Sequence, residues 1–162
     1  MRKLFVLAGV LAMLSFGVDA VAAATGPSVT GGGKTATDIF SVNAHSDVPL
    51  LGGPATGHLV AKENPIFRSV ETFNFAGDVT CLRTLGPVGV VGGTVTQDEI
   101  NGVPVYPTLH GFWFFVVDNG NQKGLPDAIS YEYVVPTSPG AVCPAPFPPF
   151  FPLLQGNVNV ND

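Results

Sequence analysis

Charged residues are scarce in this 162-residue chain, and basic residues are the scarcest of them. Lys and Arg number 7 against 12 Asp and Glu, so the formal net charge is −5 at pH 7. The few cations are scattered, and the chain therefore lacks the basic patch that nucleic acids or anionic membrane surfaces require. We expect neither as a partner and interpret the charges as a solubilising surface.

Long hydrophobic runs are also missing beyond the N-terminal two dozen residues. There, Arg2 and Lys3 precede an apolar run at 4–16 and small residues at 20–24, an order typical of a cleavable secretory signal peptide. The apolar run is shorter than the about 20 residues that a membrane anchor needs. We predict cleavage after Ala22 or Ala24, secretion to the extracellular space, and no membrane span in the mature chain.

Cysteine is limited to Cys81 and Cys143, both in the exported part. No C-x-x-C motif occurs, which disfavours a redox or metal role for either thiol. An even count in an oxidising compartment favours a disulfide bond between them, with two unpaired buried thiols as the alternative. Closing so long a loop would stabilise the fold by roughly 4 kcal/mol in the chain-entropy model.

Helical periodicity with capping residues is absent, whereas Gly (20) and Pro (15) are abundant. Residues 1–24 are assigned to the signal peptide, 25–37 to a flexible lead-in, and 38–162 to a single β-domain with a Pro-rich loop at 136–152. The expected strands lie at 38–44, 56–63, 70–75, 78–84, 88–96, 103–105, 112–117, 128–135 and 155–160. Eight or nine short strands of this spacing predict an all-β fold, an antiparallel β-barrel or alternatively a β-sandwich.

Alternation assigns faces to these strands. Phe73, Phe75, Val79 and Cys81 fall on one face of the strands around 70–84. The segment 112–117 is apolar on both faces, which indicates a central strand covered on both sides. In the segment 128–135 the inward residues are expected to be Ile129, Tyr131, Tyr133 and Val135, and the outward ones Ser130 and Glu132.

Turns separate the expected strands. Asn101-Gly102 predicts a two-residue hairpin, and Gly92-Gly93 predicts a bulge or a close backbone approach. The Pro-rich loop contains Phe147, Phe150 and Phe151, which either cap one end of the core or form an exposed recognition patch, so the role of 144–152 is open. A last strand near the C-terminus could pair with the first and remove exposed edges.

No catalytic constellation stands out, and the chain is not expected to be an enzyme. There is no G-x-S-x-G motif, and His45, His58 and His110 lie far apart in the sequence. His45 with Asp47 forms an H-x-D pattern, which on a strand would place both side chains on one face. No cofactor is predicted, and no zinc-binding H-E-x-x-H motif occurs.

The loop from Asp118 to Asp127 collects oxygen ligands. Asp118, Asn119 and Asp127 are weak candidates for a calcium site, because calcium prefers such oxygen-rich loops. Asp118-Asn119-Gly120 is equally a good turn sequence, since Asn and Gly tolerate positive φ. We favour the turn.

Several segments in this order resemble a group of uncharacterised secreted β-domain proteins of the actinobacterial type. The matching pieces are 29–33, 40–44, 78–82, Gly92-Gly93, 117–120 with Pro126-Asp127, Cys143 and 156–158. The resemblance implies one antiparallel β-domain with the two cysteines paired, and it transfers no catalytic residue.

The function expected from the sequence is non-enzymatic. We expect extracellular binding, or a structural role in the cell envelope, with an unidentified extracellular ligand or envelope component as the partner. The alternatives are a lipocalin-like carrier of a small ligand in a hollow interior and, with less support, an extracellular hydrolase that uses the histidines. Grouping of the histidines in space would favour the hydrolase, and dispersal would disfavour it.

Overall fold

The computed structural model describes residues 26–48, 53–63, 72–105, 110–120, 125–136, 143–145 and 150–162. The predicted signal peptide at 1–24 lies outside these ranges. The described residues are all-β and form a single 12-stranded antiparallel sheet. Among them, no segment forms a helix with the length and hydrophobicity that a membrane crossing needs.

The strands follow the chain with short connections. They are β1 (Ser28–Lys34), β2 (Asp38–His45), β3 (Gly53–Pro54), β4 (Thr56–Glu63), β5 (Phe73–Leu85), β6 (Val88–Ile100), β7 (Val103–Pro104), β8 (Gly111–Val117), β9 (Ala128–Ile129), β10 (Tyr133–Val135), β11 (Phe151–Pro152) and β12 (Gln155–Asn161). Their order in the sheet is β11-β9-β8-β6-β5-β4-β2-β1-β12, while β10 pairs with β8, β3 with β5, and β7 with β6.

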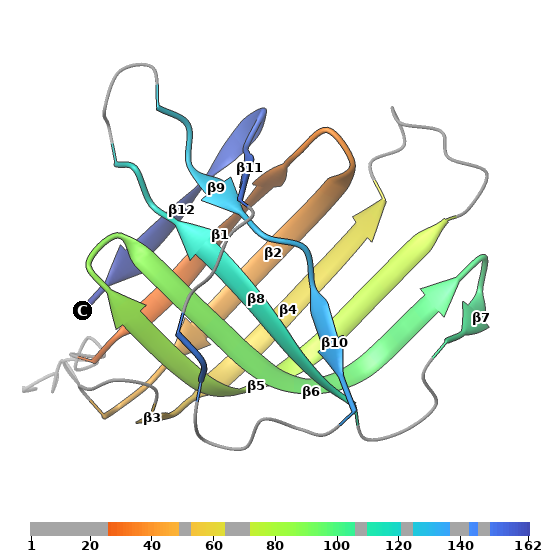
Figure 1. Ribbon diagram of the computed structural model, residues 1–162, viewed down its shortest axis with the longest axis horizontal. Coiled ribbons are helices and arrows are strands. Elements are labelled where there is room, and N and C mark those ends of the chain that lie inside the picture. Colours follow the sequence, from red (N-terminus) through yellow and green to blue (C-terminus); the bar gives the residue numbers. More distant parts are fainter. Residues whose placement is uncertain are drawn as a thin grey trace, which may run out of the picture.

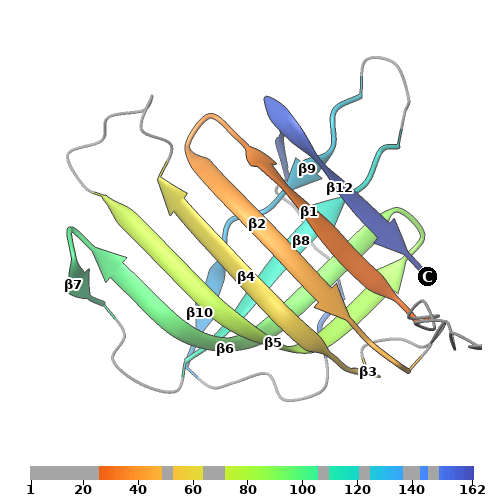
Figure 2. The same ribbon diagram turned by 180° about the vertical axis from the view of Figure 1, so that it is seen from behind.

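The sheet curls into a half-barrel. Figures 1 and 2 show β8, β9 and β10 on one side and β12, β1, β2 and β4 on the other, with the long curved strands β5 and β6 joining the two sides. The expected all-β antiparallel fold is therefore confirmed. The last strand β12 pairs along its whole length with β1, as expected for a C-terminal strand that protects the edge of the first.

The expected flexible lead-in at 25–37 needs correction, because it contains β1. Val29 is fully buried, and β1 is paired on both sides, with β2 and with β12. The run Gly31-Gly32-Gly33 hid this strand, since glycine weakens the strand pattern without forbidding pairing. A strand that is paired on both sides gains its order from its neighbours, not from its own propensity.

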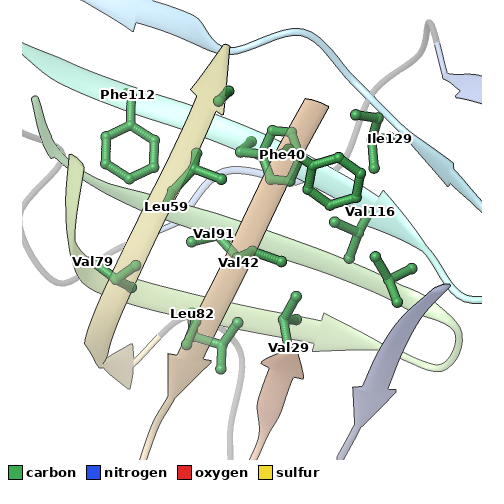
Figure 3. Packing of buried hydrophobic residues seen from close by; sticks show 14 of the residues in the cluster. Val29, Phe40, Val42, Leu59, Val79, Leu82, Val91, Phe112, Val116 and Ile129 are labelled. Atoms are coloured by element: carbon green, nitrogen blue, oxygen red, sulfur yellow. The ribbon is translucent and has the colours of Figure 1, made fainter. Parts of the chain in front are cut away.

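The main core fills the concave side of the sheet (Figure 3). Aromatic rings lie at its centre: Phe40 and Phe114 have ring centroids 5.5 Å apart, and so do Phe75 and Phe112. Aliphatic residues from β1, β2, β4, β5, β6 and β12 surround the rings. The inner residues alternate with exposed ones along β2 and β4, as one face of an antiparallel sheet requires.

A β-bulge corrects the predicted face of Cys81. The register of β5 on β6 shifts between Val79 and Cys81, so that Thr80 is an extra residue. An extra residue moves every later side chain to the opposite face. Val79 therefore belongs to the concave core, whereas Cys81 joins a second cluster on the convex side.

Strand β8 is covered on both faces, which confirms the prediction for 112–117. Phe112 and Phe114 belong to the concave core, while Phe115 packs with Val90 in the convex cluster, which also contains Cys81 and Cys143 and is bordered by Trp113, Tyr133 and Phe150. The predicted close approach at Gly92 occurs here. A Cβ at Gly92 would lie 2.7 Å from the Cys81 Sγ and would also overlap the Trp113 ring.

The predicted disulfide is present. Cys81 and Cys143 are bonded with a Cα–Cα distance of 5.7 Å, and both are buried. The bond ties the Pro-rich segment to the convex face of β5. Phe150 packs beside the bond, and the ring centroids of Phe151 and Tyr131 are 4.3 Å apart. Phe147 lies outside the described residues.

The predicted strand at 128–135 is interrupted. It splits into β9 and β10, and the residues between them follow another pattern: Ser130 is buried, and Tyr131 is 45% exposed rather than inward. The Ser130 hydroxyl accepts a hydrogen bond from the Phe115 N–H at 3.0 Å. Such a side-chain bond to the backbone replaces a rung of the ladder, which breaks the alternation.

We expect the disulfide to contribute much of the stability. Reduction should lower the free energy of unfolding by about 4 kcal/mol, because the bond closes a loop with a sequence separation of 62 residues. Urea unfolding with and without reductant measures the loss. A Cys81→Ala/Cys143→Ala variant serves as the control, since it should be equally destabilised and insensitive to reductant. Equal stability of the oxidised and reduced protein would contradict the prediction.

Candidate functional site

The three histidines are dispersed over the sheet. His58 on β4 lies on the convex face, where its Nδ1 is 3.0 Å from the Asp78 Oδ1 on β5, and both side chains are at least half exposed. His45 ends β2 and stands opposite Thr56. His110 precedes β8 and interacts electrostatically with Asp98. The three histidines therefore belong to different strands or strand ends of the described sheet.

The H-x-D pattern does place two side chains together. His45 and Asp47 line one shallow surface pocket with Pro54 and Thr56. The Nδ1 of His45 is buried and has no hydrogen-bond partner. Among the described residues, no group of three or more His, Cys, Asp or Glu side chains has an arrangement that could hold a metal ion.

The calcium candidates lie in a hydrogen-bonded seam between the β8–β9 loop and β12. The N–H of Val160 donates to the Asp118 Oδ2 at 3.1 Å, and the N–H of Val158 donates to the Asp127 Oδ2 at 2.9 Å. These N–H groups belong to the edge of β12 that faces away from β1. The two carboxylates therefore accept N–H groups that a neighbouring strand would otherwise bind at this edge.

The remaining oxygens of the two carboxylates hold the loop itself. The Asp118 Oδ1 accepts the Gly120 N–H at 2.7 Å, and the Asp127 Oδ1 accepts the Asn119 N–H at 2.8 Å. Asn119 donates its side-chain amide to the Pro126 carbonyl at 2.7 Å, and Gly120 has a φ of 60°. The predicted turn is thus present, and each of the four carboxylate oxygens already accepts a backbone N–H.

A row of polar side chains crosses the convex face of the sheet. Register pairs connect it from strand to strand over β12, β1, β2, β4, β5 and β6. All of its members are exposed or partly exposed. We call it the polar row, and it consists of Asn159, Thr30, Asn43, His58, Asp78 and Thr94.

Further polar residues extend the polar row along the strands. On one side of the polar row, Asn157 and Ser41 lie two residues from Asn159 and Asn43 along their strands. On the other side, two residues from Asn159, Thr30 and His58, lie Asn161, Ser28 and Thr56. Some are already ordered: the side-chain amide of Asn157 donates to the Asn159 Oδ1, and that of Asn161 to the Ser28 Oγ, both at 3.1 Å. The result is a regular array of hydroxyl and amide groups.

A cluster of ionisable groups lies at the end of the concave side where β2 begins and β6 ends. We call it the acidic end. Asp38 and Glu63 are direct register partners on β2 and β4, and Asp98 is the register partner of the buried Phe75. Asp98 itself is only 6% exposed. Glu132, in the link between β9 and β10, is partly buried, lies two residues before Val134 of the concave core, and interacts electrostatically with Asp38 and Asp98, so it is not the outward residue that the sequence predicted.

The surroundings of Glu132 and Asp98 favour the neutral forms of these two carboxyls. Burial raises the pKa of Glu132 to about 8; a backbone hydrogen bond opposes the rise, and the carboxylates of Asp38 and Asp98 add to it. Burial also raises the pKa of Asp98, against the effect of nearby His110. Sequence reasoning missed this cluster because Asp98 turns inward only through an extra residue in β6, at the register shift opposite Ala76/Gly77.

Comparison with protein-family models, with curated proteins and with solved structures finds no match to this chain.

We expect the seam to be structural. Asp127→Asn should destabilise the fold by about 1–3 kcal/mol, because the amide presents a donor where a buried N–H needs an acceptor. Urea unfolding measures the change. Asp47→Asn is the control, because Asp47 is exposed and we expect a change within about 0.5 kcal/mol. Equal stabilities of the two variants would contradict the structural role.

Calcium should have no effect on the seam. Thermal unfolding curves recorded with calcium and with a chelator are expected to superimpose, because the oxygens of Asp118 and Asp127 already accept backbone N–H groups. Differential scanning calorimetry checks this. A calcium-dependent rise of Tm that disappears in Asp127→Asn would assign the loop to calcium instead.

Proposed function

We propose that this chain is an exported, non-enzymatic binding domain and that it binds through the polar row. Export is supported by the N-terminal pattern of basic, apolar and small residues and by the Cys81–Cys143 disulfide, which suits an oxidising compartment. The observation that carries the binding role is the continuity of the polar row over six strands of one face.

The chemistry of the polar row suits an uncharged partner rich in hydroxyl groups. Hydroxyl and amide side chains both donate and accept hydrogen bonds. The two ionisable members, His58 and Asp78, are paired with each other, so the row offers little net charge to a charged polymer. An extended polysaccharide of the cell envelope or of the surroundings has this chemistry.

The geometry of the sheet adds regularity. Neighbouring strands lie about 4.8 Å apart, and residues of one face recur about 6.7 Å along each strand. The side chains are short, so ordering them on binding costs less conformational entropy than ordering Lys or Gln. A polymer with regularly spaced hydroxyl groups can therefore bond to several strands at once, which raises the avidity of individually weak contacts.

The two alternatives have less support. A lipocalin-like carrier needs a hollow interior, whereas buried rings from β2, β5 and β8 fill the concave side, including Phe40, Phe75, Phe112 and Phe114. A hydrolase that relies on the histidines needs them together. His45 and His58 lie on the convex face, and His110 lies beside Asp98 at the acidic end.

Sedimentation with insoluble polysaccharides tests the proposal. The disulfide-bonded protein should co-sediment with a neutral polymer, with cellulose and chitin as the probes, more than with anionic carboxymethyl-cellulose beads. A Thr30→Lys/Asn43→Lys variant should lose at least tenfold in affinity, because two long charged side chains would interrupt the centre of the polar row.

The matched control is Val103→Lys, which adds a lysine at a 64%-exposed position in β7, away from the polar row. It should bind like the unmodified protein. Circular dichroism verifies that all variants fold. No binding to either neutral polymer, or an equal loss in the control, would contradict binding by the polar row to this class of partner.

A further inference from the structure

Burying the carboxyls of the acidic end costs free energy, and the proposed binding role does not involve these residues. It gathers inward-facing carboxyls from β2, β4, β6 and the β9–β10 link, namely Asp38, Glu63, Asp98 and Glu132. His110 interacts electrostatically with Asp98, and the exposed Lys62 precedes Glu63 on β4. Burial makes ionisation of Glu132 and of Asp98 unfavourable in this partly dry site.

Glu132 lies next to a short strand with few pairing contacts. It immediately precedes β10, which is a strand of only 3 residues and is paired solely with β8. Short peripheral strands open locally at a small fraction of the cost of global unfolding. A free-energy change that the whole domain would tolerate is therefore enough to detach β10.

We propose that Glu132 and β10 form a pH-operated latch: β10 stays on β8 while the Glu132 carboxyl holds a proton, and it detaches when that proton is lost. The charged carboxylate would face Asp38 on β2 and Asp98 on β6, with Glu63 on β4 beside Asp38. Moving outward into water relieves both the desolvation and the repulsion.

The direction of the pH dependence follows from the pKa of Glu132, which burial raises from its ordinary 4.5 to about 8. In the detached state Glu132 is ionised above about pH 4.5. The attached state holds one proton more between these two values, so its stability falls as pH rises through this range and levels off above about 8. The latch is therefore closed in acidic surroundings and is driven open as the pH rises from about 4.5 towards about 8.

Detachment would expose a specific surface. In β10, Tyr133 is the register partner of Trp113 and packs against Phe115 with ring centroids 5.9 Å apart. Val134 packs on the concave core. Loss of β10 therefore uncovers apolar side chains of β8 on both of its faces and changes the surroundings of Trp113, the sole tryptophan.

Trp113 fluorescence measures the opening directly. The disulfide-bonded protein is titrated from about pH 4.5 to about 9, a range in which tyrosines, with a pKa of about 10, stay largely protonated. We expect a red shift of the emission that develops between about pH 4.5 and 8 and does not grow further above about 8. Far-UV circular dichroism should stay nearly unchanged, because only β10 moves. Hydrogen exchange of a peptide covering 130–136 should rise over the same range.

Three variants separate the latch from other titrations. Glu132→Gln should abolish the red shift, because glutamine imitates the protonated carboxyl. Asp98→Asn should reduce the red shift, because it removes one carboxylate that repels ionised Glu132 in the attached state. Glu99→Gln on the outer side of β6 is the matched control and should leave the curve unchanged. The latch is wrong if the shift persists in Glu132→Gln, if no shift occurs in the unmodified protein, or if circular dichroism is lost at the same pH.

Discussion

Two single-residue register shifts between β5 and β6 determine which side chains of these strands face the concave core and which face the convex side. An unpaired residue in a ladder bends the strand and reverses the faces of everything beyond it. The shift at Thr80 turns Cys81 to the convex side, and the shift opposite Ala76/Gly77 turns Asp98 to the concave side. The bends also help to carry β5 and β6 around the curl that joins the two sides of the half-barrel (Figure 1). A straight, regular pairing would give neither the disulfide nor the acidic end.

The edges of the sheet are protected by side chains as well as by strands. A curled sheet that stops short of full closure leaves backbone groups unpaired along its last strand, which invites pairing with other chains. Asp118 and Asp127 accept the N–H groups of Val160 and Val158 and so occupy that edge of β12. A carboxylate in this position is an acceptor only, and it cannot be replaced by an amide without presenting a donor to a donor. Oxygen-rich loops of this kind resemble cation sites in sequence, although their oxygens can be committed to the backbone.

Alternation in the sequence predicted what depends on local pattern. It located β2, β4, β8 and β12, the two-residue turn at Asn101-Gly102 and the two covered faces of β8, because each of these follows from hydrophobic period or turn chemistry over a few residues. It missed β1, whose glycines carry no pattern, and it misplaced Cys81 and Glu132. These faces depend on register shifts and on the interruption between β9 and β10. Register shifts and strand interruptions depend on how a strand pairs with segments distant in the sequence. The pattern of neighbouring residues therefore does not predict them.

The candidate sites differ in the same way. The histidines and the loop at 118–127 were visible as residue types, but the sequence could not show that the loop closes an edge or that His58 pairs with Asp78. The polar row exists only as a product of register across six strands. The acidic end is a conflict between burial and charge, which proteins retain where it serves a purpose other than stability. A core of closely packed phenylalanines and a long-range disulfide supply the stability that allows such a conflict to persist beside a three-residue strand. A three-residue strand and two carboxyls with raised pKa values therefore belong to one otherwise firmly packed sheet, and the proposed local response to pH depends on this arrangement.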